Sequence, residues 1–104
     1  MSVLHVTAEN FEQEILRAEK PALIDFWATW CGPCQMMGPI VEDYAAAHPE
    51  YVVAKVDVDE QPQLAAAFGI QSIPTLVVIK GGKGTAMAVG VQTPEQLDAL
   101  MAQE

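Results

Sequence analysis

The stretch FWATWCGPC, residues 26–34, joins an apolar run to the start of a helical pattern and holds both cysteines of the 104-residue chain. Residues 23–27, which lead into it, are apolar except for Asp25, as expected of a central strand covered on both faces. From residue 34 to about residue 48, apolar side chains recur at helical spacing, and Pro39 inside this pattern predicts a kink. A buried strand that passes directly into a helix indicates a chain of alternating strands and helices.

The other segments continue this alternation. The predicted strands are residues 3–6, 23–27, 51–58, 75–80 and 85–89, and the predicted helices are residues 10–20, 34–48, 62–68 and a closing helix from residue 93. Asn10 and Gln13 have the spacing of a capping box for the first helix. Gly81 and Gly82 suit a tight hairpin turn, and Thr93 suits the cap of the closing helix. No long linker divides these segments, so we expect one α/β domain over residues 1–104.

Composition limits the partners of the protein. Five Lys and Arg against 14 Asp and Glu give a formal net charge of -9, so the phosphate backbone of nucleic acid and anionic membrane surfaces should be repelled. No apolar run approaches the roughly 18 residues of a membrane span, and the first residues do not resemble a basic leader. We therefore expect a monomeric, cytoplasmic protein that binds neither nucleic acid nor membranes.

Cys31 lies where a predicted strand meets a predicted helix, and there unpaired backbone N–H groups and the helix dipole favour negative charge. This position should lower the pKa of its thiol from about 8.5 towards neutrality, and the thiolate is the nucleophile in disulfide exchange. Cys34 lies three residues on, on the same helix face, where it can form a disulfide with Cys31 and resolve a mixed disulfide. The pair is predicted to be a reactive dithiol, provided that the Cys31 sulfur is open to incoming disulfides.

Two other uses of the cysteines compete with this interpretation. A zinc site needs four ligands, and Cys31, Cys34 and His48 would supply three, with no second histidine within five residues of His48. A structural disulfide would close so short a loop that it removes little entropy from the unfolded chain. Permanent disulfides are also uncommon inside reducing compartments. We expect no metal.

The motif WCGPC at residues 30–34 follows DFW at residues 25–27, and IPT at residues 73–75 comes about forty residues later. Together these motifs resemble the thioredoxin family, in order and over essentially the whole chain. The resemblance implies a thioredoxin fold, with a central mixed five-stranded sheet flanked by four helices. It further implies a thiol–disulfide oxidoreductase that needs no cofactor beyond the redox-active Cys31–Cys34 disulfide. Such a protein reduces disulfides in client proteins and is re-reduced by a thioredoxin reductase, which is a flavoprotein.

Two charged residues interrupt apolar strands. Burial of Asp25 would raise the pKa of its carboxyl group, and the resemblance implies that Asp25 accepts the proton of Cys34. The alternative is a strand-end aspartate whose oxygens accept hydrogen bonds from backbone amides. Lys55, in the middle of residues 51–58, has two interpretations: it pairs with Asp25 and tunes it, or it extends from an edge strand to solvent.

The resemblance also implies a cis peptide bond before Pro74, which would offer the backbone of Ile73 to an extended substrate segment. The alternative is a proline that simply starts a strand. Trp27 suits the hydrophobic core as well as it suits a place in the site. The expected substrate-binding surface is a small apolar rim around Cys31, formed by Trp30, Gly32, Pro33, Ile73, Pro74, Gly90 and Val91.

The chain departs from the family pattern at two places. Gln35 stands where many members carry a lysine, so one positive charge near the thiolate is missing. Residues 79–83, IKGGK, replace a strand end and turn that usually contain phenylalanine. Two other functions are considered: a redox-inert binding module, and an oxidase or isomerase on the same fold. Intact cysteines and Asp25 argue against the first, and residues 32–33 between the cysteines resemble the reducing branch of the family.

Overall fold

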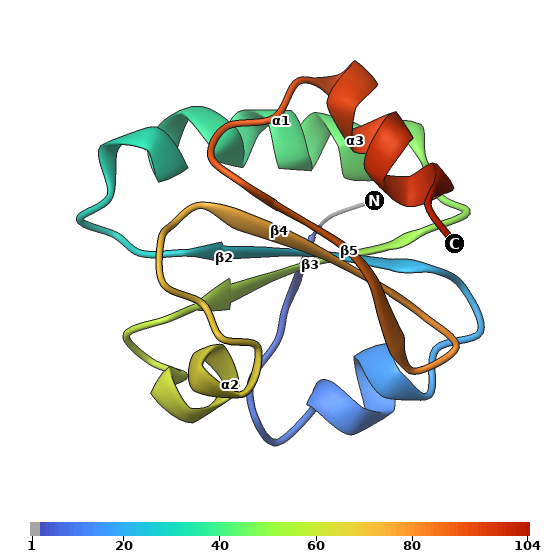
Figure 1. Ribbon diagram of the computed structural model, residues 1–104, viewed down its shortest axis with the longest axis horizontal. Coiled ribbons are helices and arrows are strands. Elements are labelled where there is room, and N and C mark those ends of the chain that lie inside the picture. Colours follow the sequence, from blue (N-terminus) through green and yellow to red (C-terminus); the bar gives the residue numbers. More distant parts are fainter. Residues whose placement is uncertain (1–2) are drawn as a thin grey trace.

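The computed structural model describes residues 3–104 (Figure 1); Met1 and Ser2, the first residues of the predicted domain, lie outside the described residues. One five-stranded sheet has the order β1-β3-β2-β4-β5. Strands β1, β3 and β2 are parallel, whereas β4 is antiparallel to β2 and to β5. The strands are β1 (Leu4–His5), β2 (Ala22–Trp27), β3 (Val52–Asp57), β4 (Thr75–Lys80) and β5 (Lys83–Val89). The helices are the π-helix η1 (Glu12–Leu16), α1 (Gly32–Ala47), α2 (Pro62–Ala67) and α3 (Pro94–Ala102).

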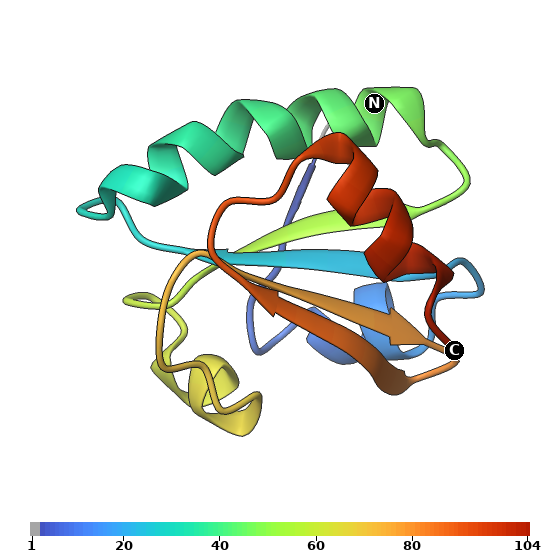
Figure 2. The same ribbon diagram turned by 45° about the horizontal axis from the view of Figure 1, so that its top comes forward.

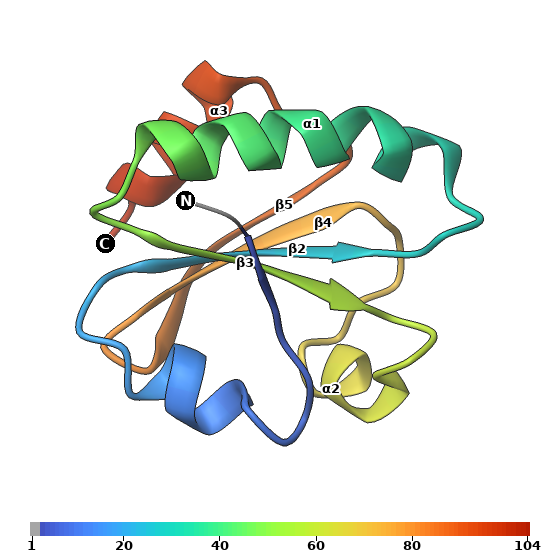
Figure 3. The ribbon, with the colours of Figure 1, turned by 180° about the vertical axis from the view of Figure 1, so that it is seen from behind.

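Helices cover both faces of the sheet. Figures 1 and 2 show α1 and α3 together over one face, and Figure 3 shows η1 and α2 against the other. Because side chains alternate along a strand, β2 supplies both cores. Leu23 packs with Met37 and Leu97 on the α1 and α3 side, while Phe26 packs with Ile15 on the η1 and α2 side. The prediction of a mixed five-stranded sheet with four helices is confirmed.

The first predicted helix is present but shorter than residues 10–20. It is a five-residue π-helix, and its N-cap residue, Phe11, makes no side-chain capping hydrogen bond. Asn10 instead closes the preceding turn, because its Oδ1 accepts a hydrogen bond from Thr7 N at 2.8 Å and its side-chain amide donates to His5 O at 3.2 Å. The predicted capping box therefore does not form. The strand before it is also shorter than predicted, with only Leu4 and His5 in β1.

The other local signals agree more closely with the structure. The hairpin turn has φ of 58° at Gly81 and 79° at Gly82, values that favour glycine, and β5 starts directly after it. Thr93 caps α3, as predicted. It forms a reciprocal capping box with Gln96. Helix α1 begins at Gly32, earlier than predicted, and continues through Pro39, where the kink stays a prediction.

Candidate active site

The disulfide lies at the start of α1. Cys31 is the N-cap residue of this helix, with extended backbone angles, and Pro33 occupies its first turn. Proline suits this place because its fixed φ is helical and its missing N–H would have no partner there. Cys31 and Cys34 are joined in a disulfide, with their Cα atoms 5.3 Å apart. Cys31 Sγ also accepts a hydrogen bond from Cys34 N at 3.2 Å, so a backbone donor is directed at the sulfur that should carry the negative charge.

Cys31 is much less accessible than the sequence argument required. Both cysteines are only 5% exposed. The expectation of a sulfur standing open to solvent is therefore wrong for this disulfide form. The physical reason is close packing, since the cysteines form a small apolar cluster with Ala28 and the partly buried Trp27 and Ile73.

The peptide bond between Ile73 and Pro74 is cis, so that prediction is confirmed. The loop before β4 approaches the disulfide, and Ile73 O lies 3.7 Å from Cys31 Sγ. Pro74 O accepts a hydrogen bond from Gly90 N at 2.8 Å, which ties this loop to the end of β5. Gly90 has φ of 95°, a conformation that side chains disfavour.

These contacts bring the residues of the predicted rim together at one end of the strands, next to the disulfide. Figure 1 shows this region, where β2 ends and α1 and β4 begin. Trp30 is 69% exposed and Val91 is 36% exposed. Ile73 is half-buried and Pro74 is buried, so Pro74 contributes the shape of the loop more than contact area. Gly32 and Pro33 are exposed, and Gly90 is half-buried.

Asp25 is completely buried in the middle of β2, where it is 0% exposed. By strand alternation its side chain lies on the same face as Leu23, under α1. Neither carboxylate oxygen has a hydrogen-bond partner among the described residues, so the interpretation as a backbone-bonded aspartate is wrong. Burial raises the pKa of Asp25 from 3.8 to about 6, and the positive charge of Lys55 opposes part of this rise.

Lys55 lowers the pKa of Asp25 through its charge, as the first interpretation expected, but the two side chains do not pair. It lies opposite Asp25 in the register of β2 and β3, but no ion pair within residues 3–104 joins the two side chains. Strand β3 lies between β1 and β2, so Lys55 does not extend from an edge. Its Nζ lies 4.5 Å from the centre of the Trp27 ring, a cation–π contact. Lys55 therefore acts on Asp25 at longer range, through its charge.

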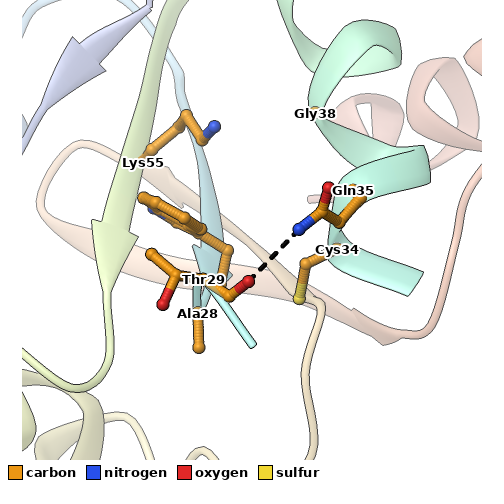
Figure 4. Close-up of a pocket in the computed structure, with 7 residues that line it drawn as sticks. Ala28, Thr29, Cys34, Gln35, Gly38 and Lys55 are labelled. Carbon is orange, nitrogen blue, oxygen red and sulfur yellow. Dashed lines mark hydrogen bonds between the residues drawn. The ribbon is translucent and has the colours of Figure 1, made fainter. Parts of the chain in front are cut away.

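A pocket of about 300 Å³ lies beside Cys34. Figure 4 shows how β2, the following loop, α1 and β3 supply its walls. Gln35 Nε2 donates a hydrogen bond to Thr29 O at 3.2 Å across this space. The lining residues are Trp27, Ala28, Thr29, Cys34, Gln35, Gly38 and Lys55.

Asp59 also contributes to this part of the site, although its sequence pattern did not indicate it. Asp59 Oδ2 accepts a hydrogen bond from Trp30 Nε1 at 2.7 Å, which holds the most exposed large apolar side chain of the rim. Asp59 lies in a turn where Asp57 Oδ1 accepts hydrogen bonds from the backbone N–H groups of Asp59 and Glu60. An indole N–H commonly has an acceptor, but nothing in the sequence indicated which carboxylate would supply it.

The zinc interpretation is wrong. His48 caps the far end of the 16-residue helix α1, roughly 24 Å along the axis from the cysteines, which are bonded to each other. Within residues 3–104, no three His, Cys, Asp or Glu side chains are grouped to hold a metal ion. The helices in the same part of the chain are also too short or too polar to span a bilayer.

A disulfide at the start of a helix, approached by a loop with a cis-proline, is the arrangement of thiol–disulfide oxidoreductases. The family model described as Thioredoxin matches residues 2–103. Thioredoxin of Alicyclobacillus acidocaldarius subsp. acidocaldarius is 49% identical over 102 residues, which cover 97% of this chain and 96% of that protein. Thioredoxin 2 of Chlorobaculum tepidum is 51% identical over 85 residues, which cover 81% of this chain and 78% of that protein.

The chain belongs to the thioredoxin family. It is a thiol–disulfide oxidoreductase that reduces disulfides in protein substrates by dithiol–disulfide exchange.

Proposed function

We propose that Cys31 is the attacking thiolate, Cys34 the resolving thiol and Asp25 the proton acceptor of this reaction. The observation that carries the proposal is the Cys31–Cys34 disulfide in the first turn of α1, with Cys34 N directed at Cys31 Sγ. In the reduced protein the same backbone N–H would stabilise the Cys31 thiolate.

In the first step, the Cys31 thiolate attacks one sulfur of the substrate disulfide. A bond forms between Cys31 Sγ and that sulfur while the substrate S–S bond breaks, and the second substrate sulfur leaves as a thiolate. The result is a mixed disulfide between Cys31 and the client. The leaving thiolate then takes a proton from solvent.

In the second step, Cys34 loses its proton and attacks Cys31 Sγ, which releases the first client sulfur and restores the disulfide of the structure. The substrate gains two electrons and two protons, and the dithiol of the protein is oxidised. Asp25 suits the role of acceptor for the Cys34 proton because its pKa of about 6 lies close to neutrality.

The rim is the proposed docking surface for client polypeptides. Ile73 O, 3.7 Å from Cys31 Sγ, is a backbone acceptor beside the reacting sulfur, where an extended client segment can pair as an added strand does. Trp30, held by Asp59, adds exposed apolar area. Recognition through backbone and shape would be broad. The docking residues are Trp30, Gly32, Pro33, Ile73, Pro74, Gly90 and Val91.

The setting of this activity is proposed as well. The chain would act as one domain over residues 1–104, as a monomer in the cytoplasm, without a metal or other cofactor. A thioredoxin reductase would return electrons to Cys31 and Cys34, which makes the protein a carrier in electron transport and cell redox homeostasis. The net charge of -9 supports the absence of nucleic acid and anionic membranes from the list of partners.

Reduction of insulin tests the proposed function directly. With dithiothreitol as the electron source, the protein should accelerate the appearance of precipitated insulin B chain over dithiothreitol alone. A rate equal to that of dithiothreitol alone would contradict the proposal. It would leave the redox-inert binding module as the remaining use of the same rim.

The role of Asp25 predicts a particular pH dependence. Asp25→Asn removes the proton acceptor, so the second step should slow most near neutral pH and less at high pH, where hydroxide can take the Cys34 proton. The measurement is the rate of release of the client from the mixed disulfide between pH 6 and 9, followed by rapid mixing.

Asp43→Asn is the matched control, because this exposed carboxyl group of α1 lies outside the site. It should leave the pH profile unchanged. A slowing in Asp25→Asn that is the same at every pH would remove the proton-acceptor role from Asp25.

A further inference from the structure

The pocket beside Cys34 has walls from three parts of the chain. Cys34, Gln35 and Gly38 come from α1, Lys55 comes from β3, and Trp27 with the two residues after it comes from β2 and its following loop (Figure 4). Its volume of about 300 Å³ compares with about 30 Å³ for a water molecule in the liquid, so it can hold several waters.

The opening of this pocket can be located from exposure. Of its lining residues, only Thr29 and Gln35 are exposed, whereas Cys34 is buried and Lys55 is half-buried. These two exposed residues are joined by the hydrogen bond from Gln35 Nε2 to Thr29 O, at 3.2 Å. The bond therefore runs across the outer side of the pocket, from α1 to the loop after β2.

Asp25 is next to a residue of the pocket wall in the sheet. It is not among the lining residues and is 0% exposed, yet its neighbour in register, Lys55, does line the pocket. In the sheet, Asp25 pairs with Lys55 on β3 and with the uncharged Leu76 on β4. The hydrogen bond between Gln35 and Thr29 joins the two exposed residues of the pocket that Cys34 also lines.

We propose that Gln35 is a positioning residue whose amide bridge to Thr29 narrows the mouth of this pocket and limits access of water and small molecules to Cys34. The consequence for Asp25 rests on its proposed role as proton acceptor. By keeping water away, the bridge helps to keep this carboxyl group desolvated, in line with its raised pKa. Because Gln35 is neutral, it does so without adding a second positive charge beside Lys55.

The first test measures access to Cys34. In a reduced Cys31→Ser background, Cys34 is the single thiol, and its alkylation by iodoacetamide is followed over pH to separate the thiol pKa from the limiting rate at high pH. Gln35→Ala and Gln35→Met both remove the donor, and Met keeps the length of the side chain. The limiting rate should rise about threefold or more in both variants, as expected when a local barrier to access is removed.

Met36→Ala is the matched control, because Met36 is the next residue of the same helix turn, is 65% exposed and does not line the pocket. It should leave the limiting rate unchanged. Equal limiting rates in Gln35→Ala, Gln35→Met and the Cys31→Ser parent overturn the proposal. So does acceleration in Gln35→Ala alone, because the bulk of the side chain, and not the bridge, would then cover the mouth.

The second test follows the Asp25 carboxyl carbon by NMR titration of the oxidised protein. Gln35→Ala should move the pKa of Asp25 from about 6 towards 3.8, as solvation of the charged form improves. An unchanged pKa of Asp25 in Gln35→Ala would contradict the proposed effect of the bridge on Asp25. Neither readout depends on turnover, so a failure of the bridge is distinguishable from a failure of Asp25 as the proton acceptor.

Discussion

Cys31→Ser should lower the reduction of insulin to the rate of dithiothreitol alone, whereas Cys34→Ser should trap the client on the protein as a mixed disulfide. The difference follows from the order of the two steps. Without the sulfur at the N-cap of α1, no nucleophile faces the client, because a serine hydroxyl stays protonated at neutral pH and does not attack disulfides. Without Cys34, the first step proceeds and the second has no attacking thiol.

The trapped species is measured by mass spectrometry and by electrophoresis without reductant. It should carry one client chain for each protein chain and should disappear when dithiothreitol is added. The double variant Cys31→Ser/Cys34→Ser is the control and should trap nothing. Trapping by Cys31→Ser in place of Cys34→Ser would reverse the two roles, and full turnover by Cys34→Ser would contradict the resolving role.

The free energy of unfolding of Asp25→Asn, measured relative to the wild type, should be about 2 to 3 kcal/mol higher at pH 8 than at pH 4. The carboxyl group has a pKa of about 6 in the folded protein against an ordinary value of 3.8. Between these values folded Asp25 binds more protons than unfolded Asp25, so its contribution to the stability of the wild type falls as the pH rises from about 4 to about 6 and is level above that. An asparagine does not titrate and therefore escapes this loss.

The measurement is urea unfolding of both proteins at pH 4, 6 and 8, with the oxidised disulfide intact. Comparing variant with wild type at each pH cancels the titration of the other carboxyl groups. Asp43→Asn, at an exposed position of α1, should show no such pH-dependent gain. A difference between Asp25→Asn and the wild type that is the same at all three pH values would contradict the raised pKa of Asp25.

The sequence predicted the order of elements well where the signals are local. Strand β4 begins and ends at the predicted residues, and Thr93 caps α3, because strand periodicity and helix capping act within a few residues. The first helix is shorter than predicted and lacks the predicted capping box. Asn10 has the chemistry of a cap but uses both of its side-chain groups on the turn and strand before it.

Among the site residues, those indicated by local spacing were predicted, whereas some contacts that depend on the pairing of distant segments were not. The spacing of Cys31 and Cys34 indicated a disulfide at a helix start, and the structure places it there. Lys55 was predicted to pair with Asp25, but it contacts the Trp27 ring and acts on Asp25 only through its charge, because this contact depends on how β2 and β3 pair. The bond between Asp59 and Trp30 was missed because it joins residues 29 positions apart.

Periodicity, capping and the spacing of the cysteines are properties of neighbouring residues, so they specify alternating strands and helices with a cysteine pair at a helix start without reference to the fold. Which distant residues meet that pair depends on how the strands and helices pack. Ile73, 42 positions from Cys31, reaches its sulfur because β4 lies beside β2. The pKa of Asp25 is likewise set by the sheet and helix that exclude water from it, and desolvation exists only once the chain is folded.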